Sequence, residues 1–200
     1  MKTHTQQAKR FFATLLFSTL VLVFPTSSAA DSYEDDDWYK KAFKELKPLA
    51  EQGEVITQFN LGEMYEGGLG IRQDYAEAVK WYRKAAEQGY ALAQHNLGHM
   101  YGEGEGVPQN YAEAVKWYRE AAEQGFLKAQ FALGSMYDRG RGVPQDYIEA
   151  HKWFNLAATQ RSEVQEKARE NRDLLEKRMT SAQIAEAQKL AREWKPKLNE

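Results

Sequence analysis

Residues 90–125 read YALAQHNLGHMYGEGEGVPQNYAEAVKWYREAAEQG, and a closely similar run occurs 36 positions earlier and 36 positions later. The strongest matches are the Leu-Gly pairs that begin at positions 61, 97 and 133 and the Met-Tyr pairs that begin at 64, 100 and 136. Tandem units of about 20 to 50 residues indicate a solenoid, because each unit has an apolar face that it buries only against its neighbour. The sequence therefore predicts stacked repeats.

Each unit has the spacing of two helices. In the quoted unit, apolar residues recur at intervals of three and four on one face of a first helix: Ala93, Leu97, Met100 and Tyr101. A second helix is predicted over residues 110–124, with a wide stripe of aromatic residues and alanines. The predicted fold class is therefore all-α, built from helix-turn-helix units.

The segment between the two helices is rich in glycine. Gly102, Gly104 and Gly106 are predicted to end the first helix and to adopt positive φ angles, which glycine tolerates because it has no Cβ. Asn110 is predicted to cap the second helix by accepting hydrogen bonds from its first amides. The equivalent residues of the other units, Asp74 and Asp146, are predicted to do the same.

Another glycine lies inside the first helix of every unit, at positions 62, 98 and 134. A glycine in the middle of a helix costs about 1 kcal/mol relative to alanine. Its presence at one register in three units predicts that the two helices cross closely there, with an aromatic ring of the second helix in the adjoining space.

This pattern of a Leu-Gly pair, a Met-Tyr pair, a glycine-rich turn, a Trp-Tyr pair and a closing Gln-Gly pair closely resembles the Sel1-like repeat, a relative of the tetratricopeptide repeat with a longer turn. The resemblance covers units 54–89, 90–125 and 126–161, and the third unit departs from it where Arg161 replaces the closing glycine. It implies a right-handed α/α solenoid that acts as an adaptor for other proteins.

Residues 1–30 have the layout of a secretory signal peptide. Three basic residues precede the uncharged run Phe11–Phe24, and small residues follow up to Ala30. The run is shorter than the roughly 20 residues that cross a membrane as a helix. We therefore expect cleavage after Ala30, export to the periplasm and no stable membrane insertion; retention as an anchor is the alternative.

The repeats are flanked by two further segments. Residues 31–53 are expected to form an acidic lead-in and an N-terminal helix that resembles the second helix of a repeat. Residues 162–200 are expected to form C-terminal capping helices, and Thr180 with Gln183 has the spacing of a capping box at the start of the last one. A charged outer face suits a terminal cap, since that face stays in water.

Composition excludes several functions. Lys and Arg number 27 against 29 Asp and Glu, so no basic surplus favours nucleic acid as a partner. The absence of cysteine excludes disulfide scaffolds, cysteine nucleophiles and thiolate metal sites. No nucleophile motif or acid/base carboxylate pair indicates an active site, so we expect neither catalysis nor a cofactor.

Two alternatives stay open. His95 and His99 lie four residues apart on one predicted helix and would offer two ligands to a metal, with Glu63 and Glu66 on the preceding unit, although no motif supplies a third ligand. The other alternative is an envelope hydrolase acting on cell-wall or β-lactam substrates. Some exported Sel1-like proteins have been assigned such activity, but those proteins are cysteine-rich.

A binding surface is the preferred interpretation. By analogy with the tetratricopeptide repeat, the first helices line a concave groove, and the residues expected to face it differ between units: Phe59, Asn60, Glu63, Glu66, His95, Asn96, His99, Glu103, Phe131, Ser135 and Arg139. Phe59 and Phe131 are predicted to be apolar anchors, and Asn60 and Asn96 to offer amides to an extended peptide. The predicted function is a non-enzymatic adaptor of the bacterial cell envelope that binds another protein or peptide; the oligomeric state is left open.

Overall fold

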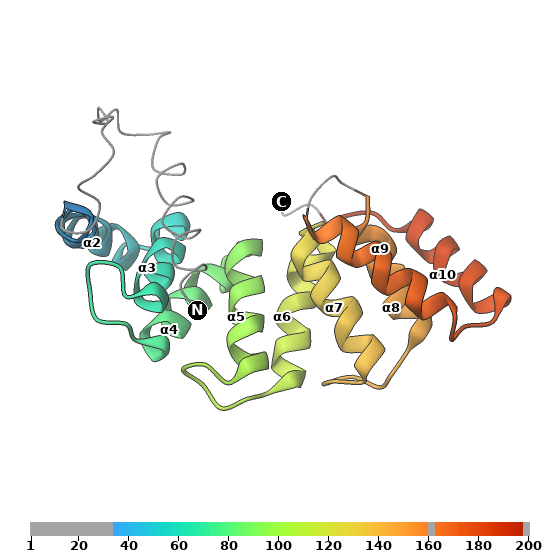
Figure 1. Cartoon of the computed structure of the whole chain (residues 1–200). Coiled ribbons are helices and arrows are strands. Elements are labelled where there is room, and N and C mark those ends of the chain that lie inside the picture. Colours follow the sequence, from blue (N-terminus) through green and yellow to red (C-terminus); the bar gives the residue numbers. More distant parts are fainter. Residues whose placement is uncertain (1–33, 160–162, 198–200) are drawn as a thin grey trace.

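The computed structural model describes residues 34–159 and 163–197, and all the regular secondary structure in them is α-helical (Figure 1). The helices are α2 (Glu34–Glu51), α3 (Val55–Gly67), α4 (Tyr75–Glu87), α5 (Ala91–Glu103), α6 (Tyr111–Glu123), α7 (Leu127–Arg139), α8 (Tyr147–Ala157), α9 (Glu163–Glu176) and α10 (Ser181–Glu193). Successive hairpins stand in a row, which confirms the all-α solenoid. The expected signal peptide (1–30) and Arg161 lie outside the described residues.

The second helix of each repeat begins at a side-chain cap. Asp74 accepts a hydrogen bond from the Glu77 amide, and Asn110 and Asp146 each accept two from the first turns of α6 and α8. These contacts confirm the three predicted caps. By contrast, the first helices α3, α5 and α7 have no side-chain cap.

Helix α5 ends at Glu103, one residue beyond Gly102. Gly104 ends α5 with φ 75°, and Gly68 and Gly140 end α3 and α7 in the same left-handed conformation. Gly102 lies within α5, so the prediction of a positive φ at that residue was wrong. The reason is that the turn needs only two left-handed residues, and Gly104 and Gly106 supply them.

The mid-helix glycines mark close helix crossings, as predicted. A Cβ on Gly98 would lie 2.8 Å from Cδ1 of Tyr118 and 3.2 Å from the carbonyl oxygen of Ala114. The equivalent distances are 2.5 Å from Gly62 to Tyr82 and 2.9 Å from Gly134 to Phe154. In every repeat, the ring of the second aromatic residue therefore fills the space that a glycine leaves open.

The second glycine of each turn joins neighbouring repeats. A Cβ on Gly106 would lie 2.3 Å from the carbonyl oxygen of Tyr75, which belongs to the preceding repeat. Gly142 approaches Tyr111 in the same way, and Gly70 approaches the backbone of Tyr39 on α2. Helix α2 thus takes the place of a second helix at the N-terminal end of the row.

Buried glutamines tie each repeat to the one before it. Gln58, Gln94 and Gln130 donate hydrogen bonds of 3.1 to 3.2 Å to carbonyl groups in the last turns of α2, α4 and α6. Each of these carbonyls also accepts a hydrogen bond from the amide of the glycine that follows its helix, so the glutamine side chain adds a second donor. Gln88 and Gln124 in turn donate to the side-chain oxygens of Gln58 and Gln94, the buried glutamines of their own repeats, at 2.7 Å.

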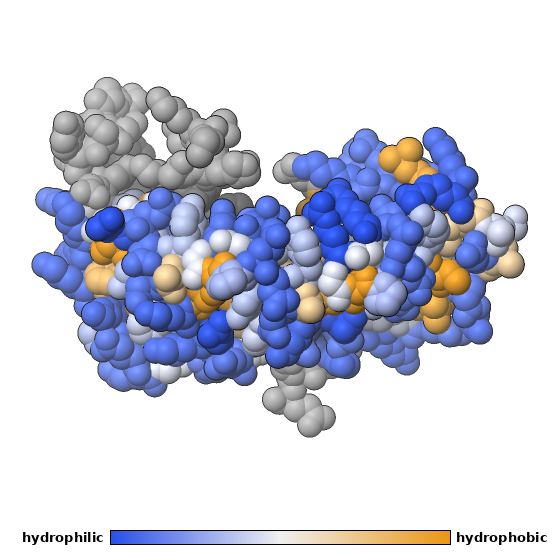
Figure 2. Space-filling model, turned by 90° about the horizontal axis from the view of Figure 1, so that it is seen from below, coloured by the Kyte–Doolittle hydropathy of each residue, from blue (hydrophilic) through white to orange (hydrophobic). Residues whose placement is uncertain are grey.

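The apolar core is a series of clusters rather than one mass. One cluster joins α2 to the first repeat, a second joins the first and second repeats, and a third joins the second and third. The face seen from below is mostly hydrophilic, and its apolar patches are small and separate (Figure 2). Each hairpin therefore buries its apolar residues against its neighbours.

The C-terminal helices form the predicted cap but do not form another hairpin. Helices α9 and α10 each pack against α8 rather than against one another. Helix α9 contains no glycine, and Glu170, 36 positions after the crossing glycine Gly134, is exposed. The capping box of Thr180 and Gln183 at the start of α10 is confirmed.

A buried histidine of α8 contacts a glutamate of α9. His151 is fully buried where the other repeats carry Val79 and Val115, and its Nε2 lies 2.8 Å from Oε1 of Glu176 on α9. Its side chain packs inside the cap interface.

Gly98 and Gly102 form a matched pair for testing the close crossing. Gly98→Ala is expected to lower the free energy of unfolding by about 1 to 3 kcal/mol, because its Cβ meets the ring of Tyr118. Gly102→Ala, whose Cβ would have no neighbour nearer than 3.7 Å, is expected to be neutral or to stabilise by up to about 1 kcal/mol. Chemical denaturation of both variants measures the difference, and equal stabilities would contradict the crossing.

Candidate peptide-binding face

The outward side of α3, α5 and α7 forms what we call the A-helix face. It is defined by two repeat registers seven residues apart, which lie on the same side of a helix: Ile56, Leu92 and Lys128 in the first, and Glu63, His99 and Ser135 in the second. All six side chains are exposed or half-buried. The three helices therefore present one surface whose chemistry changes from repeat to repeat.

The predicted apolar anchors belong to the internal packing. Phe59 is only 4% exposed, and its ring centroid lies 5.6 Å from that of Tyr82 and 5.2 Å from that of Tyr90. His95 and Phe131 stand at the same register and lie 5.6 Å from Tyr118 and Phe154. The prediction that Phe59 faces the groove was wrong, because this register stacks on the second helix; Phe131 is half-buried.

The two predicted amides differ. Asn60 is only 6% exposed, so its predicted role as a surface amide was wrong. Asn96 is half-buried, and its Oδ1 lies 3.2 Å from Nδ1 of His95. In the third repeat, the half-buried Ser135 donates a hydrogen bond to the carbonyl of Phe131. Asn60 is buried and Asn96 is accessible, so the first helices of the first and second repeats are not buried to the same extent at this register.

Two glutamates of α3 sit in a poorly solvated place. Burial and, to a smaller extent, the neighbouring Glu66 raise the pKa of Glu63 to about 8. Burial also raises the pKa of Glu66, although the hydroxyl of Tyr82 donates a hydrogen bond to it and His99 is close enough to oppose the shift. At neutral pH the Glu63 carboxyl is therefore mostly protonated and can donate a hydrogen bond.

The two histidines have different surroundings. Burial lowers the pKa of His95 to about 4, so its imidazole is neutral at pH 7. Its ring packs against Tyr118 and Phe126. His99 is half-exposed, with Nδ1 3.9 Å from Oε2 of Glu105. No group of three or more potential metal-ligating His, Cys, Asp or Glu residues lies together within residues 34–159 and 163–197.

The remaining predicted residues lie at the far ends of the first helices. Glu103 ends α5 and Arg139 ends α7, and both are exposed. The sequence interpretation missed Ile56, Leu92 and Lys128 at the opposite ends. These residues lie seven positions before the Glu63 register, so the same helical spacing that selected Glu63 was sufficient to find them.

An apolar cavity opens beside the start of α5. Its volume is about 410 Å³, and its apolar lining comes from Val55, Tyr90, Leu92 and Phe126. Leu92 belongs to the A-helix face, so the cavity adjoins that face. Ile56, next to Val55, is 51% exposed and adds a further apolar side chain.

The A-helix face thus combines apolar side chains at one end with polar groups along its length. Protonated Glu63 and neutral His95 favour hydrogen bonding over charge pairing at neutral pH. Lys128 is close enough to influence the pKa of both groups, and the exposed charges of Glu103 and Arg139 lie at the ends of α5 and α7. Such a surface fits an extended polypeptide, which offers backbone amides together with apolar side chains.

The fold is a scaffold of helical repeats, and comparison with known proteins identifies the family of these repeats. The Sel1 repeat model matches residues 55–90, 91–126 and 127–162. The chain belongs to the Sel1 repeat family. Proteins of this family are generally non-enzymatic scaffolds that bind other proteins. No helix within the described residues is long and apolar enough to cross a membrane.

Two solved structures are similar to this chain. One is a Sel1 repeat protein from Oxalobacter formigenes, 38% identical, with a TM-score of 0.64 over 71% of this chain and 57% of that one. The other is c5321, a protective antigen present in uropathogenic Escherichia coli strains that displays an SLR fold; it is 34% identical, with a TM-score of 0.70 over 96% of this chain and 38% of that one. The chain therefore spans less than two thirds of either protein. A search of curated proteins finds no significant match.

The protonation of Glu63 predicts a pH dependence of stability. Its pKa is raised from 4.5 to about 8 on folding, so its contribution is complete below pH 4.5 and is lost as the pH rises through 8. His95, with a pKa lowered to about 4, acts in the opposite direction only below about pH 6.5. Between pH 6.5 and 8.5 the free energy of unfolding is therefore expected to fall by up to about 2 kcal/mol.

The Glu63→Gln variant keeps the neutral shape of the side chain and removes its titration. Thermal unfolding of both proteins at pH 6.5 and 8.5 measures the effect, and the variant is expected to lose less stability than the wild type. The same decline in both proteins would assign the pH dependence to other groups, Glu66 first among them.

Proposed function

We propose that this protein is a non-enzymatic adaptor of the bacterial cell envelope that holds an extended protein segment on its A-helix face. The observation that carries the proposal is the contrast between registers within one scaffold. The crossing glycine, the turn glycine and the buried glutamine repeat in all three units, whereas the accessible positions change from Glu63 to His99 to Ser135. Packing does not dictate these side chains, so they are available for recognition.

The chemistry of the face supports a polypeptide ligand. Leu92 and the apolar cavity beside it offer a place for a large apolar side chain. The carboxyl of Glu63 and the amide of Asn96 offer hydrogen bonds to a backbone within the same face. Family membership supports binding rather than catalysis, since Sel1 repeat proteins are generally interaction scaffolds.

The envelope setting rests on the sequence of residues 1–30. The basic start, the uncharged run Phe11–Phe24 and the small residues before Asp31 are typical of a cleaved signal peptide. The absence of cysteine suits an exported chain, because no thiol is at risk of unwanted oxidation in the periplasm.

Export is tested by expression of the full chain in a Gram-negative host. The periplasmic fraction is expected to contain a form that begins at Asp31, identified by the intact mass of the purified protein. A cytoplasmic protein that keeps residues 1–30 would contradict the proposed location without bearing on the binding face.

Binding is tested by crosslinking capture from envelope extracts. The double variant Ile56→Asp with His99→Ala changes two exposed side chains of the A-helix face and is expected to reduce capture of a specific partner about tenfold or more. Leu174→Asp, which changes a 57% exposed residue of α9, serves as the matched control and is expected to capture normally. Equal capture by all three proteins would overturn the role of this face.

A further inference from the structure

The two ends of the row of hairpins are finished differently. At the C-terminal end, α9 and α10 pack on α8, and the chain then returns to α6. There the backbone N–H of Lys197 donates a 2.7 Å hydrogen bond to the carbonyl of Glu123, and the Lys197 side chain pairs with the Glu123 carboxylate. At the other end of the row stands α2 (Figure 1). An isolated chain therefore has one end that is covered and one that α2 alone forms within the described residues.

Helix α2 corresponds to the second helix of a repeat whose first helix is absent from residues 34–159 and 163–197. The second helices α4, α6 and α8 each pack against the first helix of their own repeat. They carry fully buried alanines at one shared register: Ala85, Ala121 and Ala157. The residue 36 positions before Ala85 is Leu49 on α2, and it is 38% exposed. The register that is buried in every repeat is therefore accessible to solvent in α2.

Leu49 belongs to an apolar strip on the outer side of α2, which we define by Trp38, Ala42 and Leu49. These residues are four and seven positions apart, so they lie on one side of the helix. Trp38 is 44% exposed. The strip does not include Tyr39, which is buried, or Lys40, which lies on the opposite side of the helix. The end of a helical-repeat protein usually has a polar outer face, so an apolar strip at this place indicates a partner.

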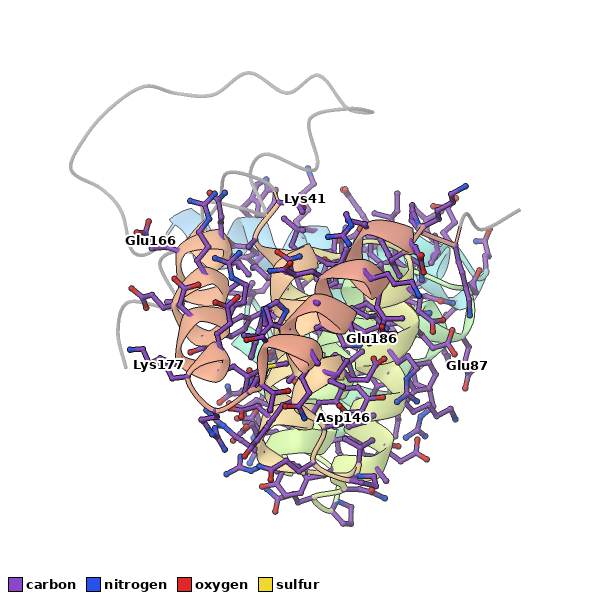
Figure 3. All side chains as sticks on the ribbon, turned by 90° about the vertical axis from the view of Figure 1, so that its right-hand side faces the viewer. Lys41, Glu87, Asp146, Glu166, Lys177 and Glu186 are labelled. Atoms are coloured by element: carbon purple, nitrogen blue, oxygen red, sulfur yellow. The ribbon has the colours of Figure 1, made fainter. Side chains whose placement is uncertain are left out.

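Two opposite charges flank the apolar strip. Lys41 and Glu45 are exposed, and they follow Trp38 by three and seven positions, which places both along one edge of the strip. Neither forms an ion pair with another residue of the described ranges. Figure 3 shows Lys41 at the margin of the molecule. The remaining lysines of α2 lie on the opposite side of the helix: Lys40, Lys44 and Lys47. The strip thus has one cation and one anion beside it in each chain.

The spacing of these residues is complementary to itself. The midpoint between Trp38 and Leu49 lies between positions 43 and 44, and the midpoint between Lys41 and Glu45 lies at position 43. If two α2 helices pack antiparallel around a two-fold axis at this point, Trp38 of each helix lies opposite Leu49 of the other. In the same arrangement, Lys41 of one helix lies within about 2 Å, measured along the helix axis, of Glu45 of the other. A two-fold interface requires a self-complementary patch of this kind.

We propose that a second copy of this chain covers the apolar strip, in a head-to-head dimer with antiparallel α2 helices. Two contacts between Trp38 and Leu49 flank two ion pairs between Lys41 and Glu45. Ala42 lies next to the two-fold axis, and its small side chain lets the helices approach closely. The dimer joins two rows at their N-terminal ends, so it carries two A-helix faces. It does not depend on what the A-helix face binds, and the two proposals can fail separately.

Sedimentation equilibrium of the purified protein is expected to show a monomer–dimer equilibrium that depends on concentration. Leu49→Asp is expected to weaken the dimer about tenfold or more, because it places a carboxylate opposite Trp38 of the other chain. Leu174→Asp makes the same change at a 57% exposed leucine of α9 and is the matched control, with the dimerisation of the wild type. Circular dichroism checks that both variants keep their helices. A wild-type protein that is monomeric at every concentration would overturn the proposal and leave the strip to residues that precede α2 or to a different protein.

Two charge reversals test the ion pairs across the axis. Lys41→Glu leaves two acidic residues beside the strip and Glu45→Lys leaves two basic ones, so each variant alone is expected to dimerise about tenfold more weakly than the wild type. An equimolar mixture of the two variants brings unlike charges together again and is expected to restore a dimer that contains one chain of each. Wild-type dimerisation by both single variants, or no recovery in the mixture, would overturn the antiparallel contact. A dimer that persists in Leu49→Asp would place the interface elsewhere.

Discussion

The close contact between a helical glycine and an aromatic ring is the constraint on which this solenoid depends. Gly62, Gly98 and Gly134 bring the two helices of each repeat so near that a single added carbon would overlap a ring of the second helix. This spacing sets the angle of each hairpin and thereby the surface that the next hairpin meets. Helix α9 contains no glycine, and α9 and α10 each pack against α8 instead of forming a close hairpin.

A scaffold held in this way leaves some positions free. The crossing, the turn glycine and the glutamine that reaches the preceding repeat are the same in all three units. The outward positions of α3, α5 and α7 take no part in these contacts, and they carry acid, imidazole, hydroxyl and apolar groups. One consequence is electrostatic: Glu63 and His95 are both neutral at pH 7, because partial burial opposes either charge.

The sequence was sufficient for the features that depend on local chemistry and on period. The helical hairpins, the caps at Asp74, Asn110 and Asp146, the close crossings and the capping box at Thr180 are all confirmed. The burial of Phe59 and Asn60 was not predictable in the same way, because it depends on how far each helix rotates toward its partner. The contact of Gly106 with Tyr75 joins two repeats. The spacing of residues within one unit does not predict a contact between units.

The return of the chain from α10 to Glu123 changes how the row behaves as an assembly. Repeat proteins usually come apart from their ends, since each unit depends only on its neighbours. Here the hydrogen bond and ion pair between Lys197 and Glu123 close a ring of structure that encloses α7, α8 and the cap. The C-terminal half is thereby closed on itself, and we expect fraying to start at the end that begins at α2.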